Sequence, residues 1–371
     1  MKLLFWLSLL FIVLAYVGYP VWLYFRARFR PRPVRRGCIF PRVTIVLAVR
    51  NEEKNLPAKL QNLAALNYPA ERVEVIVVSD GSTDDTNHIL AGWRSRHRLA
   101  VILPEHRGKD VALNRGVAEA HGEIVVFTDA RQIIAPEALE NLVGNFADPS
   151  IGCVSGELVI AERSTTTSSQ GVGLYWRVEK KMRHWEALAG STIGATGAFY
   201  AVRRNLVAAL PEATILNDVY IPLQVVQQGF RVVFEPRAIA TDDLAPGPGK
   251  EFQRKVRTLT GNYQLLRLSP WLVTSANPVR FEFVCHKLLR LAMPFALAGL
   301  FVASLVLKEA PYRIFLAFQL ILAGLAAIAM LRPKLGILSR LADVSLTFLV
   351  LNTAAAVAFI YFVLGKKQIW V

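Results

Sequence analysis

Hydrophobic residues along this chain fall into long runs near the ends and short runs in the middle. Four segments without a charged residue cover positions 3–25, 291–307, 314–331 and 344–365. Each approaches or exceeds the ~20 apolar residues that an α-helix needs to cross a bilayer. We therefore predict a membrane helix at the N-terminus and about three transmembrane or interfacial helices within residues 286–371.

The middle of the chain has the mixed polarity of a globular domain. Its apolar runs are short, nearly continuous and separated by segments of helical character, which is typical of strands covered by helices on both faces. This alternation predicts βαβ units and an α/β fold class, Rossmann-like with a mostly parallel sheet. The strands are expected at 43–49, 73–80, 100–103, 123–129, 197–204 and 231–236.

These patterns divide the chain into five parts. Residues 1–25 are expected to be a transmembrane anchor, 26–41 an Arg/Pro-rich juxtamembrane linker, and 42–250 the α/β domain. Residues 251–285 begin with EFQRKVRTLTGNYQLLRL, which is basic and apolar by turns. Such a helix lies naturally along a bilayer surface, so we predict an amphipathic interface segment before the helices of 286–371.

A basic block, RARFRPRPVRR from Arg26 to Arg36, follows the first apolar segment. A cleaved signal peptide is disfavoured because the apolar run is long and no small-residue cleavage site follows it. The positive-inside rule places the block, and with it the α/β domain, in the cytoplasm of a multi-pass inner-membrane protein. Four spans would leave both termini outside, yet Lys366 and Lys367 near the C-terminus argue mildly against this. The side of the C-terminus therefore stays open.

The formal net charge of +15 raises the question of a nucleic-acid partner. Many of the basic residues flank the apolar segments, however, and no RNA- or DNA-binding motif accompanies them. Membrane lipids with anionic headgroups and a phosphorylated substrate are the simpler partners. The three cysteines, Cys38, Cys153 and Cys285, fit neither a zinc spacing nor a disulfide framework and are expected to be reduced.

Polar clusters follow three of the predicted strands: AVRNEE after the first, SDGSTDDT after the second and TDAR after the fourth. Taken alone, such residues are also what turns and helix caps require. Ligands of parallel sheets gather at the carboxyl ends of the strands. Three clusters at successive strand ends therefore favour a ligand site over three unrelated caps.

These motifs, RNEEKNL, VIVVSDGSTDDT, GKDVALNRG and VVFTDA in this order, resemble glycosyltransferase family 2 over roughly residues 43–262. With its apolar flanks, the chain looks like the membrane-embedded branch that includes synthases of cellulose, hyaluronan and poly-N-acetylglucosamine. The resemblance implies a GT-A fold that binds a nucleoside-diphosphate sugar and transfers the sugar with inversion.

The resemblance also assigns residues to the nucleotide-sugar donor. Asp80 would accept a hydrogen bond from the base imide, commonly that of uracil, while Ala48, Arg50 and Glu52 would line the nucleoside pocket. An aromatic residue often stacks at the position of Arg50, and a guanidinium can also lie flat on a base. Lys109 would meet the diphosphate as a compact positive charge; the alternative is an ordinary solvated lysine.

The family often has Asp-x-Asp after the fourth strand, where this chain has Asp129 followed by Arg131. Magnesium commonly needs only one or two protein carboxylates when substrate phosphates complete its coordination. By resemblance, Asp129 is the expected ligand of Mg²⁺ or Mn²⁺. Arg131 would then contact either the substrate or a nearby acid in a structural salt bridge.

Asp218 in LNDVY resembles the family's catalytic aspartate, the base that takes the proton of the acceptor hydroxyl. The alternative is a helix cap, since Asn-Asp before a helical stretch is also a capping pattern. Acceptor binding would fall to Thr196 and Gly197. Processive members carry Gln-x-x-Arg-Trp further on, of which this chain retains Arg257 for the diphosphate but has Thr258 in place of the tryptophan.

The sequence therefore predicts an inverting glycosyltransferase that transfers a sugar from a UDP-type donor to a lipid-linked or growing glycan acceptor, for cell-surface or extracellular polysaccharide synthesis. One alternative is a processive synthase that also extrudes its product, which Thr258 disfavours. An alternative of another class is a non-catalytic membrane scaffold with a degenerate domain. The retained Asp80, Lys109, Asp129 and Asp218 argue against the scaffold.

Overall fold

The computed structural model describes the chain except residues 94–96, 161–168, 243–247, 332–336 and 366–371. In the described part, a single mixed sheet has the strand order β3-β2-β1-β4-β7-β6-β8-β5. Its strands are β1 (Val43–Val49), β2 (Val73–Asp80), β3 (Arg98–Leu103), β4 (Ile124–Thr128), β5 (Ile133–Ile134), β6 (Ile151–Ile160), β7 (Phe199–Arg203) and β8 (Arg231–Asp242).

The predicted α/β class is confirmed, and all six expected strands are present; five differ by at most two residues at an end, while the strand expected at 231–236 extends to Asp242. Strands β1 to β4 pair in parallel, as do β6 and β8, whereas β7 runs antiparallel to β4 and β6. Strand β6 was not predicted, because IGCVSGELVI contains two glycines and weak alternation. One of them, Gly152, leaves no room for a Cβ, which would lie 2.5 Å from Val225 of the adjacent helix.

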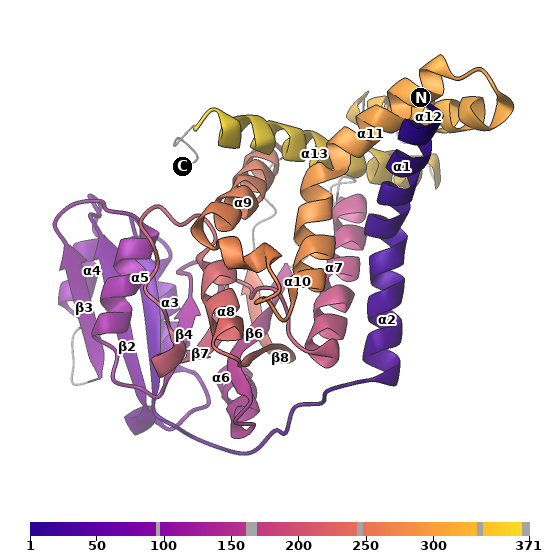
Figure 1. Cartoon of the computed structure of the whole chain (residues 1–371). Coiled ribbons are helices and arrows are strands. Elements are labelled where there is room, and N and C mark those ends of the chain that lie inside the picture. The colour runs from indigo at the N-terminus through magenta and orange to yellow at the C-terminus, as the bar shows by residue number, and fades with distance from the viewer. Residues whose placement is uncertain (94–96, 161–168, 243–247, 332–336, 366–371) are drawn as a thin grey trace.

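Helices cover both faces of the sheet, and others extend away from it (Figure 1). The short 3-10 and π elements are η1 (Leu14–Gly18), η2 (Ala70–Arg72), η3 (Gly144–Ala147), η4 (Arg204–Leu206), η5 (Pro270–Val273) and η6 (Val284–Leu288). The α-helices are α1 (Lys2–Val13), α2 (Tyr19–Phe29), α3 (Leu56–Ala64), α4 (Thr86–Ala91), α5 (Lys109–Ala118), α6 (Ala138–Val143), α7 (Ser169–Ala189), α8 (Asn217–Gln227), α9 (Pro248–Leu268), α10 (Arg280–Phe283), α11 (Leu289–Val306), α12 (Ala310–Leu331) and α13 (Ile337–Val363).

Alternate residues of each strand enter two separate hydrophobic cores. In β1, Ile45 and Leu47 pack with α3, α4 and α6, while Val46 faces the core formed with α5 and α8. Both faces of the central strands are therefore buried, which explains their nearly continuous hydrophobicity in the sequence. The second core extends to Leu265 of α9 and to Phe283 of α10. This layer connects the sheet to the C-terminal helices.

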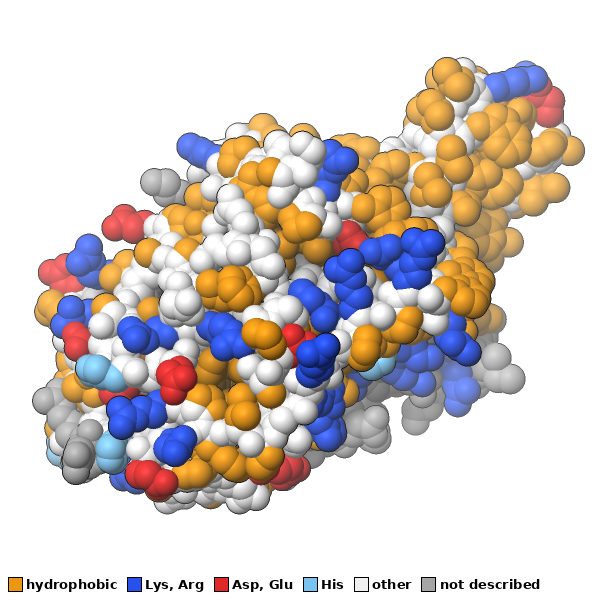
Figure 2. All heavy atoms as spheres, turned by 60° about the horizontal axis from the view of Figure 1, so that its bottom comes forward, with side chains coloured by type: hydrophobic (Ala, Val, Ile, Leu, Met, Phe, Trp, Pro, Cys, Tyr) orange, Lys and Arg blue, Asp and Glu red, His pale blue; other side chains and the backbone are white. Residues whose placement is uncertain are grey.

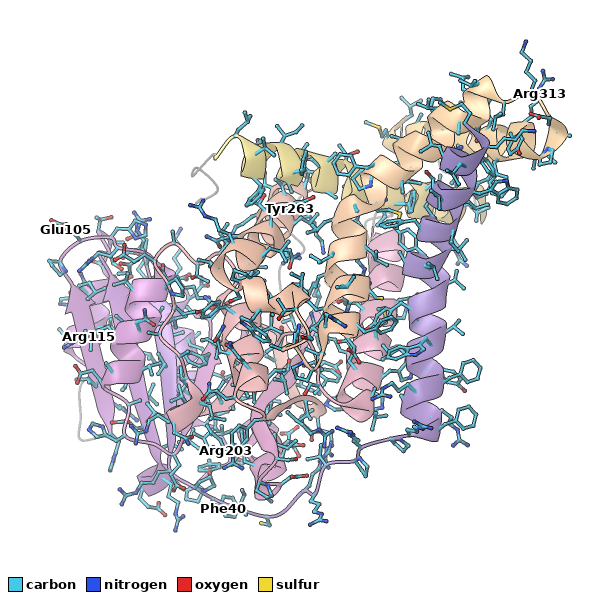
Figure 3. The ribbon with its side chains drawn as sticks, viewed as in Figure 1. Phe40, Glu105, Arg115, Arg203, Tyr263 and Arg313 are labelled. Atoms are coloured by element: carbon cyan, nitrogen blue, oxygen red, sulfur yellow. The ribbon has the colours of Figure 1, made fainter. Side chains whose placement is uncertain are left out.

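Among the residues that the structure describes, four helical segments are long and apolar enough to cross a membrane: 2–29, 280–306, 310–331 and 339–363. Helices α1, α11 and α12 pack together through Phe5, Leu300 and Tyr312. They form an arm whose surface is mostly hydrophobic in Figure 2. Its far end carries charge, because Lys2 and Glu309 form an ion pair of 2.7 Å there and Figure 3 labels Arg313 at the tip. These features indicate a membrane protein.

Helix α13 contacts α12 of the arm as well as α9. In Figure 1 it crosses the direction of α1 and α11 and lies over α9. The contact is apolar, with Val256 of α9 buried against Ala354 and Ala358 of α13. The expectation that one C-terminal segment is interfacial stays a prediction. Four basic residues that flank the C-terminal apolar segments lie outside the described residues: Arg332, Lys334, Lys366 and Lys367. Most of the short loop STTTSSQG (164–171) also lies outside them.

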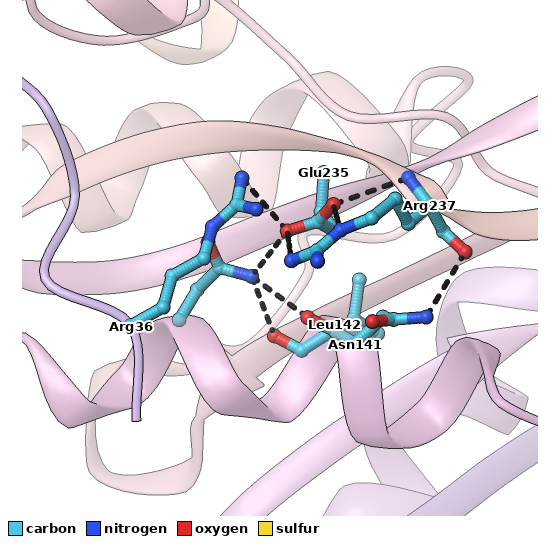
Figure 4. A network of polar contacts seen from close by, with 6 residues as sticks. Arg36, Asn141, Leu142, Glu235 and Arg237 are labelled. Carbon is cyan, nitrogen blue, oxygen red and sulfur yellow. Dashed lines mark hydrogen bonds and ion pairs between the residues drawn. The ribbon is translucent and has the colours of Figure 1, made fainter. Parts of the chain in front are cut away.

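The juxtamembrane linker is fastened to the α/β domain by a buried carboxylate (Figure 4). Glu235 is fully buried, and its Oε2 lies 2.9 Å from Nη2 of Arg36 and accepts a 3.1 Å bond from Asn145. Its Oε1 accepts two bonds from Arg237. At least one arginine of the basic block therefore binds the protein's own domain rather than a lipid headgroup.

Candidate active site

The carboxyl ends of the parallel strands meet at the edge of the sheet that faces α9 and α13. Figure 3 labels Glu105, which follows β3, on the same side of the molecule as Tyr263 of α9. Phe40, which precedes β1, and Arg203, at the end of the antiparallel β7, lie at the opposite edge. The strand ends that carry the predicted ligand residues thus lie on the side of the sheet that faces α9 and α13.

The loops after β1 and β2 are bonded to each other. The backbone N–H of Asn51 donates to Oγ of Ser82 at 3.1 Å, and its side-chain Oδ1 accepts from the N–H of Thr83 at 2.8 Å. The N–H of Glu52 donates to Oγ1 of Thr86 at 2.9 Å. Asn51 holds a left-handed φ of 52°, a conformation that asparagine tolerates. This bracing fixes the edge that carries the predicted nucleoside-pocket residues Ala48, Arg50 and Glu52.

Asp80, at the end of β2, holds the loop that leads into α5. It is 3% exposed, and its Oδ1 accepts from the N–H of Arg107 at 2.8 Å. Its Oδ2 accepts from the N–H of Gly108 at 3.0 Å and lies 2.7 Å from Nδ1 of His106. An ionised carboxylate offers about four lone-pair sites, so these contacts occupy most of them. The contact of Asp80 with a nucleotide base stays a prediction.

The first two residues of α5 connect two parts of the site. Nζ of Lys109 lies 2.6 Å from Oδ1 of Asp129, and both side chains are about one-third exposed. Lys109 is therefore ion-paired and not merely solvated. The next residue, Asp110, is buried and accepts a 2.7 Å bond from the N–H of Ala213, in the segment that precedes Asp218. Helix α5 thereby links the end of β4 to the start of α8.

Asp129 is an open carboxylate at the end of β4. In the described part of the chain, no three histidine, cysteine, aspartate or glutamate side chains gather into a metal cage. The donor set fits a divalent ion that takes one protein carboxylate and completes its shell with diphosphate oxygens and water. Arg131 points elsewhere: its Nη2 donates to Oδ2 of Asp242 at 2.7 Å. Of the two expected partners of Arg131, the substrate or a nearby acid, the structure shows the acid, Asp242.

Asp218 is the second residue of α8, and no side-chain capping bond begins this helix. Its Oδ2 lies beside Gly197, where an added Cβ would approach to 3.2 Å, so a larger residue there would crowd the carboxylate. The backbone of the neighbouring Thr196 is held by a 2.9 Å bond to Oγ of Ser155. Burial raises the pKa of the Asp218 carboxyl, and the nearby Lys109 opposes this shift. These features favour a proton acceptor over a cap.

Helix α9 runs beside the segment that precedes Asp218. Its Gly261 would place a Cβ 2.6 Å from Leu216, and its Gln264 both donates to the carbonyl of Ala213 and accepts from the N–H of Ile215. Arg257 is four residues before Gly261 and therefore shares its helix face. The predicted diphosphate residue thus lies on the helix that borders the segment before Asp218.

Two residues near the site were missed by the sequence analysis. Lys59 of α3 is fully buried and bonded to the segment that carries Asp129. Its spacing from Leu56, Leu60 and Leu63 places it on the apolar face of the helix, which is the signal that could have revealed it. Tyr200 of β7 is buried, and its hydroxyl has no hydrogen-bond partner in the described part. No sequence signal marks Tyr200.

Comparisons with known proteins bear on the family and the fold of the chain. The family profile described as glycosyl transferase family 2 matches residues 44–210. Poly-beta-1,6-N-acetyl-D-glucosamine synthase of Staphylococcus aureus strain COL is 27% identical over 229 residues, which cover 60% of this chain and 55% of the relative. The synthase of the same name from Staphylococcus epidermidis is 25% identical over 234 residues. The chain thus spans little more than half the length of these relatives.

Among solved structures, the mannosyltransferase PcManGT from Pyrobaculum calidifontis, in complex with GDP-Man and Mn²⁺, is similar over 98% of this chain and 99% of its own, with a TM-score of 0.75 and 25% identity. The similarity therefore includes the apolar helices as well as the α/β domain. Residues 44–210 of this chain thus carry a glycosyl transferase family 2 domain, and the chain has a GT-A fold.

Proposed function

We propose that the protein is an inverting glycosyltransferase that moves a sugar from a nucleoside-diphosphate donor to a lipid-linked or growing glycan acceptor. The observation that carries the proposal is the ion pair of Lys109 with Asp129, whose charges lie close enough to Asp218 to shift its pKa. A cation for the diphosphate, a carboxylate for a metal and a carboxylate for the acceptor proton are thus gathered at one edge of the sheet.

In this proposal the donor binds between the braced loops after β1 and β2. The nucleoside is lined by Ala48, Arg50 and Glu52, and its base donates a hydrogen bond to Asp80. Lys109 leaves its ion pair with Asp129 and contacts the diphosphate. A divalent ion, Mg²⁺ or Mn²⁺, held by Asp129 and the diphosphate oxygens would neutralise charge on the leaving group. The similar mannosyltransferase was solved with Mn²⁺, which supports a divalent metal here.

Asp218 acts on the acceptor side. Its carboxylate takes the proton of the acceptor hydroxyl while the hydroxyl oxygen forms a bond to the anomeric carbon. The bond between that carbon and the diphosphate oxygen breaks, and the nucleoside diphosphate leaves with the electron pair. A single displacement of this kind inverts the anomeric centre. Thr196 and Gly197 leave space for the acceptor beside Asp218, and Arg257 contributes charge near the leaving group.

The reaction is proposed to take place at the cytoplasmic face of the inner membrane. The basic block of Arg26–Arg36 supports this orientation by the positive-inside rule. The site edge faces α9 and α13, which favours an acceptor that reaches the site from the membrane side. The named synthase relatives support a role in cell-surface or extracellular polysaccharide synthesis. Thr258 provides no aromatic platform for a processive chain, which favours single transfers.

The donor base is proposed to be uracil, with a GDP-sugar as the second candidate because the similar mannosyltransferase was solved with GDP-Man. The test incubates membranes containing the protein with radiolabelled UDP-glucose, UDP-N-acetylglucosamine and GDP-mannose, with Mg²⁺ or Mn²⁺. Label should enter one product from one donor and depend on the metal. Lipid extraction then separates lipid-linked from polymeric product. If no donor is transferred or hydrolysed by folded protein, the scaffold alternative is correct.

A further inference from the structure

A lysine is buried beneath the proposed metal site. Lys59 of α3 is 0% exposed, and its Nζ donates to Oγ1 of Thr128 at 2.9 Å and to the carbonyl of Gln132 at 2.8 Å. Asp129 lies between these two partners in sequence. Lys59 therefore holds both ends of the short segment that presents the Asp129 carboxylate to the donor.

The contact continues through Thr128 to the acceptor side. Nζ of Lys59 donates to the Thr128 hydroxyl, whose single hydrogen goes in turn to the carbonyl of Ala198, at 2.8 Å. Ala198 directly follows Gly197, which borders the Asp218 carboxylate. Lys59, Thr128 and Ala198 are buried, so water does not replace a lost partner in this link.

We infer that Lys59 is a positioning residue that fixes Asp129 relative to Asp218, and thereby the donor metal relative to the acceptor base. This inference rests on the proposed function, which gives those two carboxylates their roles. Reactions that depend on the alignment of two bound groups are sensitive to small errors, and a displacement of about 1 Å can cost about 10²-fold in rate. Lys59, which donates hydrogen bonds from α3 to both Thr128 and Gln132, is suited to prevent such a displacement.

A buried lysine is a costly means of holding a loop unless its hydrogen bonds are needed. Burial lowers the pKa of Lys59 to about 7, while the nearby Asp129 opposes this shift. The neighbouring Asn62 provides a matched comparison on the same helix. It binds the N–H and the carbonyl of Ile134 at 2.9 and 2.7 Å, so it holds the continuation of the same segment without touching Thr128.

The test uses two pairs of variants in the full-length protein. Thr128→Val keeps the shape of the side chain and removes the bridging hydroxyl, whereas Thr128→Ser keeps the hydroxyl. Lys59→Met removes the ammonium group and keeps the length of the chain, whereas Asn62→Ala removes two bonds to the same segment. If Lys59→Met does not fold, the Thr128 pair still decides, because the proposed link passes through that hydroxyl.

We expect kcat for sugar transfer to fall about 10- to 100-fold in Thr128→Val and Lys59→Met, with little change in the KM of the acceptor. The kcat of the double variant should be no lower than that of either single variant, because both substitutions break the same hydrogen bond between Lys59 and Thr128. Thr128→Ser should stay close to wild type. Asn62→Ala should lower the melting temperature without lowering kcat. A normal kcat in Thr128→Val, an additive double variant, or an equal loss of kcat in Asn62→Ala would each overturn the inference.

Two readouts do not require turnover. Binding of Mn²⁺ in the presence of UDP or GDP, followed by electron paramagnetic resonance, should weaken in Lys59→Met and Thr128→Val. Amide hydrogen exchange around Gly197 should speed up in both and stay unchanged in Asn62→Ala. Unchanged exchange there would contradict the link to the acceptor side. If the wild type transfers no sugar, the proposed function fails, and these two readouts still decide whether Lys59 couples the two segments.

Discussion

Replacement of Asp218 by asparagine separates the two roles that this residue could have. Asparagine has nearly the same size and can cap a helix, but it cannot accept the proton of the acceptor hydroxyl. The side chain of Asp218 makes no capping bond at the start of α8. An aspartate in the first turn gains about 0.3–1 kcal/mol from the helix dipole. The asparagine loses this dipole interaction. Burial raises the pKa of the Asp218 carboxyl and thus disfavours its charged form, so the neutral amide offsets part of that loss. The melting temperature should therefore change little.

The effect on turnover should be much larger. General-base assistance contributes about 10²–10⁴-fold, which corresponds to roughly 3–5 kcal/mol of activation free energy. We expect kcat at saturating donor to fall by about two orders of magnitude or more, while the affinity for the nucleoside diphosphate and Mn²⁺ stays nearly constant. The assay is initial-rate transfer of labelled sugar, combined with calorimetric binding of UDP or GDP.

The pH profile gives an independent check on the same residue. Asp218 acts as a base only when ionised, so kcat/KM of the wild type should rise with pH through its pKa. Since burial raises that pKa, the acid limb should lie above the range of an ordinary aspartate. The variant should lose this limb.

Asp148→Asn serves as the control for the loss of a carboxylate elsewhere in the domain. Asp148 accepts bonds from Ser150 and from the N–H of Arg35, in the linker below the sheet. Its replacement should lower the melting temperature and leave kcat unchanged. If Asp218→Asn instead transfers sugar at nearly the wild-type rate, Asp218 is structural and the base lies elsewhere.

Three further predictions concern the metal, the buried lysine and the topology. Arg131→Ala should leave the Mn²⁺ concentration for half-maximal activity nearly unchanged, because Arg131 binds Asp242, whereas Asp129→Asn should raise it sharply; equal shifts would refute this assignment. The pKa of Lys59 drops to about 7 in the folded protein from 10.5, so the unfolded chain binds more protons between these values and stability rises with pH. Between pH 7 and 9, the unfolding free energy of the wild type should therefore gain about 1.4 kcal/mol per pH unit over Lys59→Met in denaturant titrations, and a flat difference would contradict the shift. A cysteine replacing the exposed His88, with the exposed Cys38 changed to serine, should resist an impermeant thiol reagent in intact cells, and labelling from outside would overturn the cytoplasmic orientation.

The sequence by itself determined the elements whose signal is local. Strands β1, β2 and β4 are buried on both faces, so each gives a short continuous apolar run that ends in polar residues. Such a run can be recognised within a few residues of the sequence. The edge where Asp80, Asp129 and Lys109 meet could be predicted for the same reason, because parallel strands deliver their carboxyl ends to one side of a sheet. The four long apolar segments were equally plain, since their length alone sets them apart.

The tertiary structure decided which distant groups became partners. Arg131 binds Asp242, 111 residues away, and Lys59 binds Thr128, 69 residues away, and neither spacing leaves a periodic trace in the sequence. Strand β6 was missed because its glycines weaken the local signal while they permit close packing. Local propensity reflects interactions within a few residues, whereas these pairings depend on how helices and strands pack across the whole domain, and only the folded chain brings them within hydrogen-bonding distance.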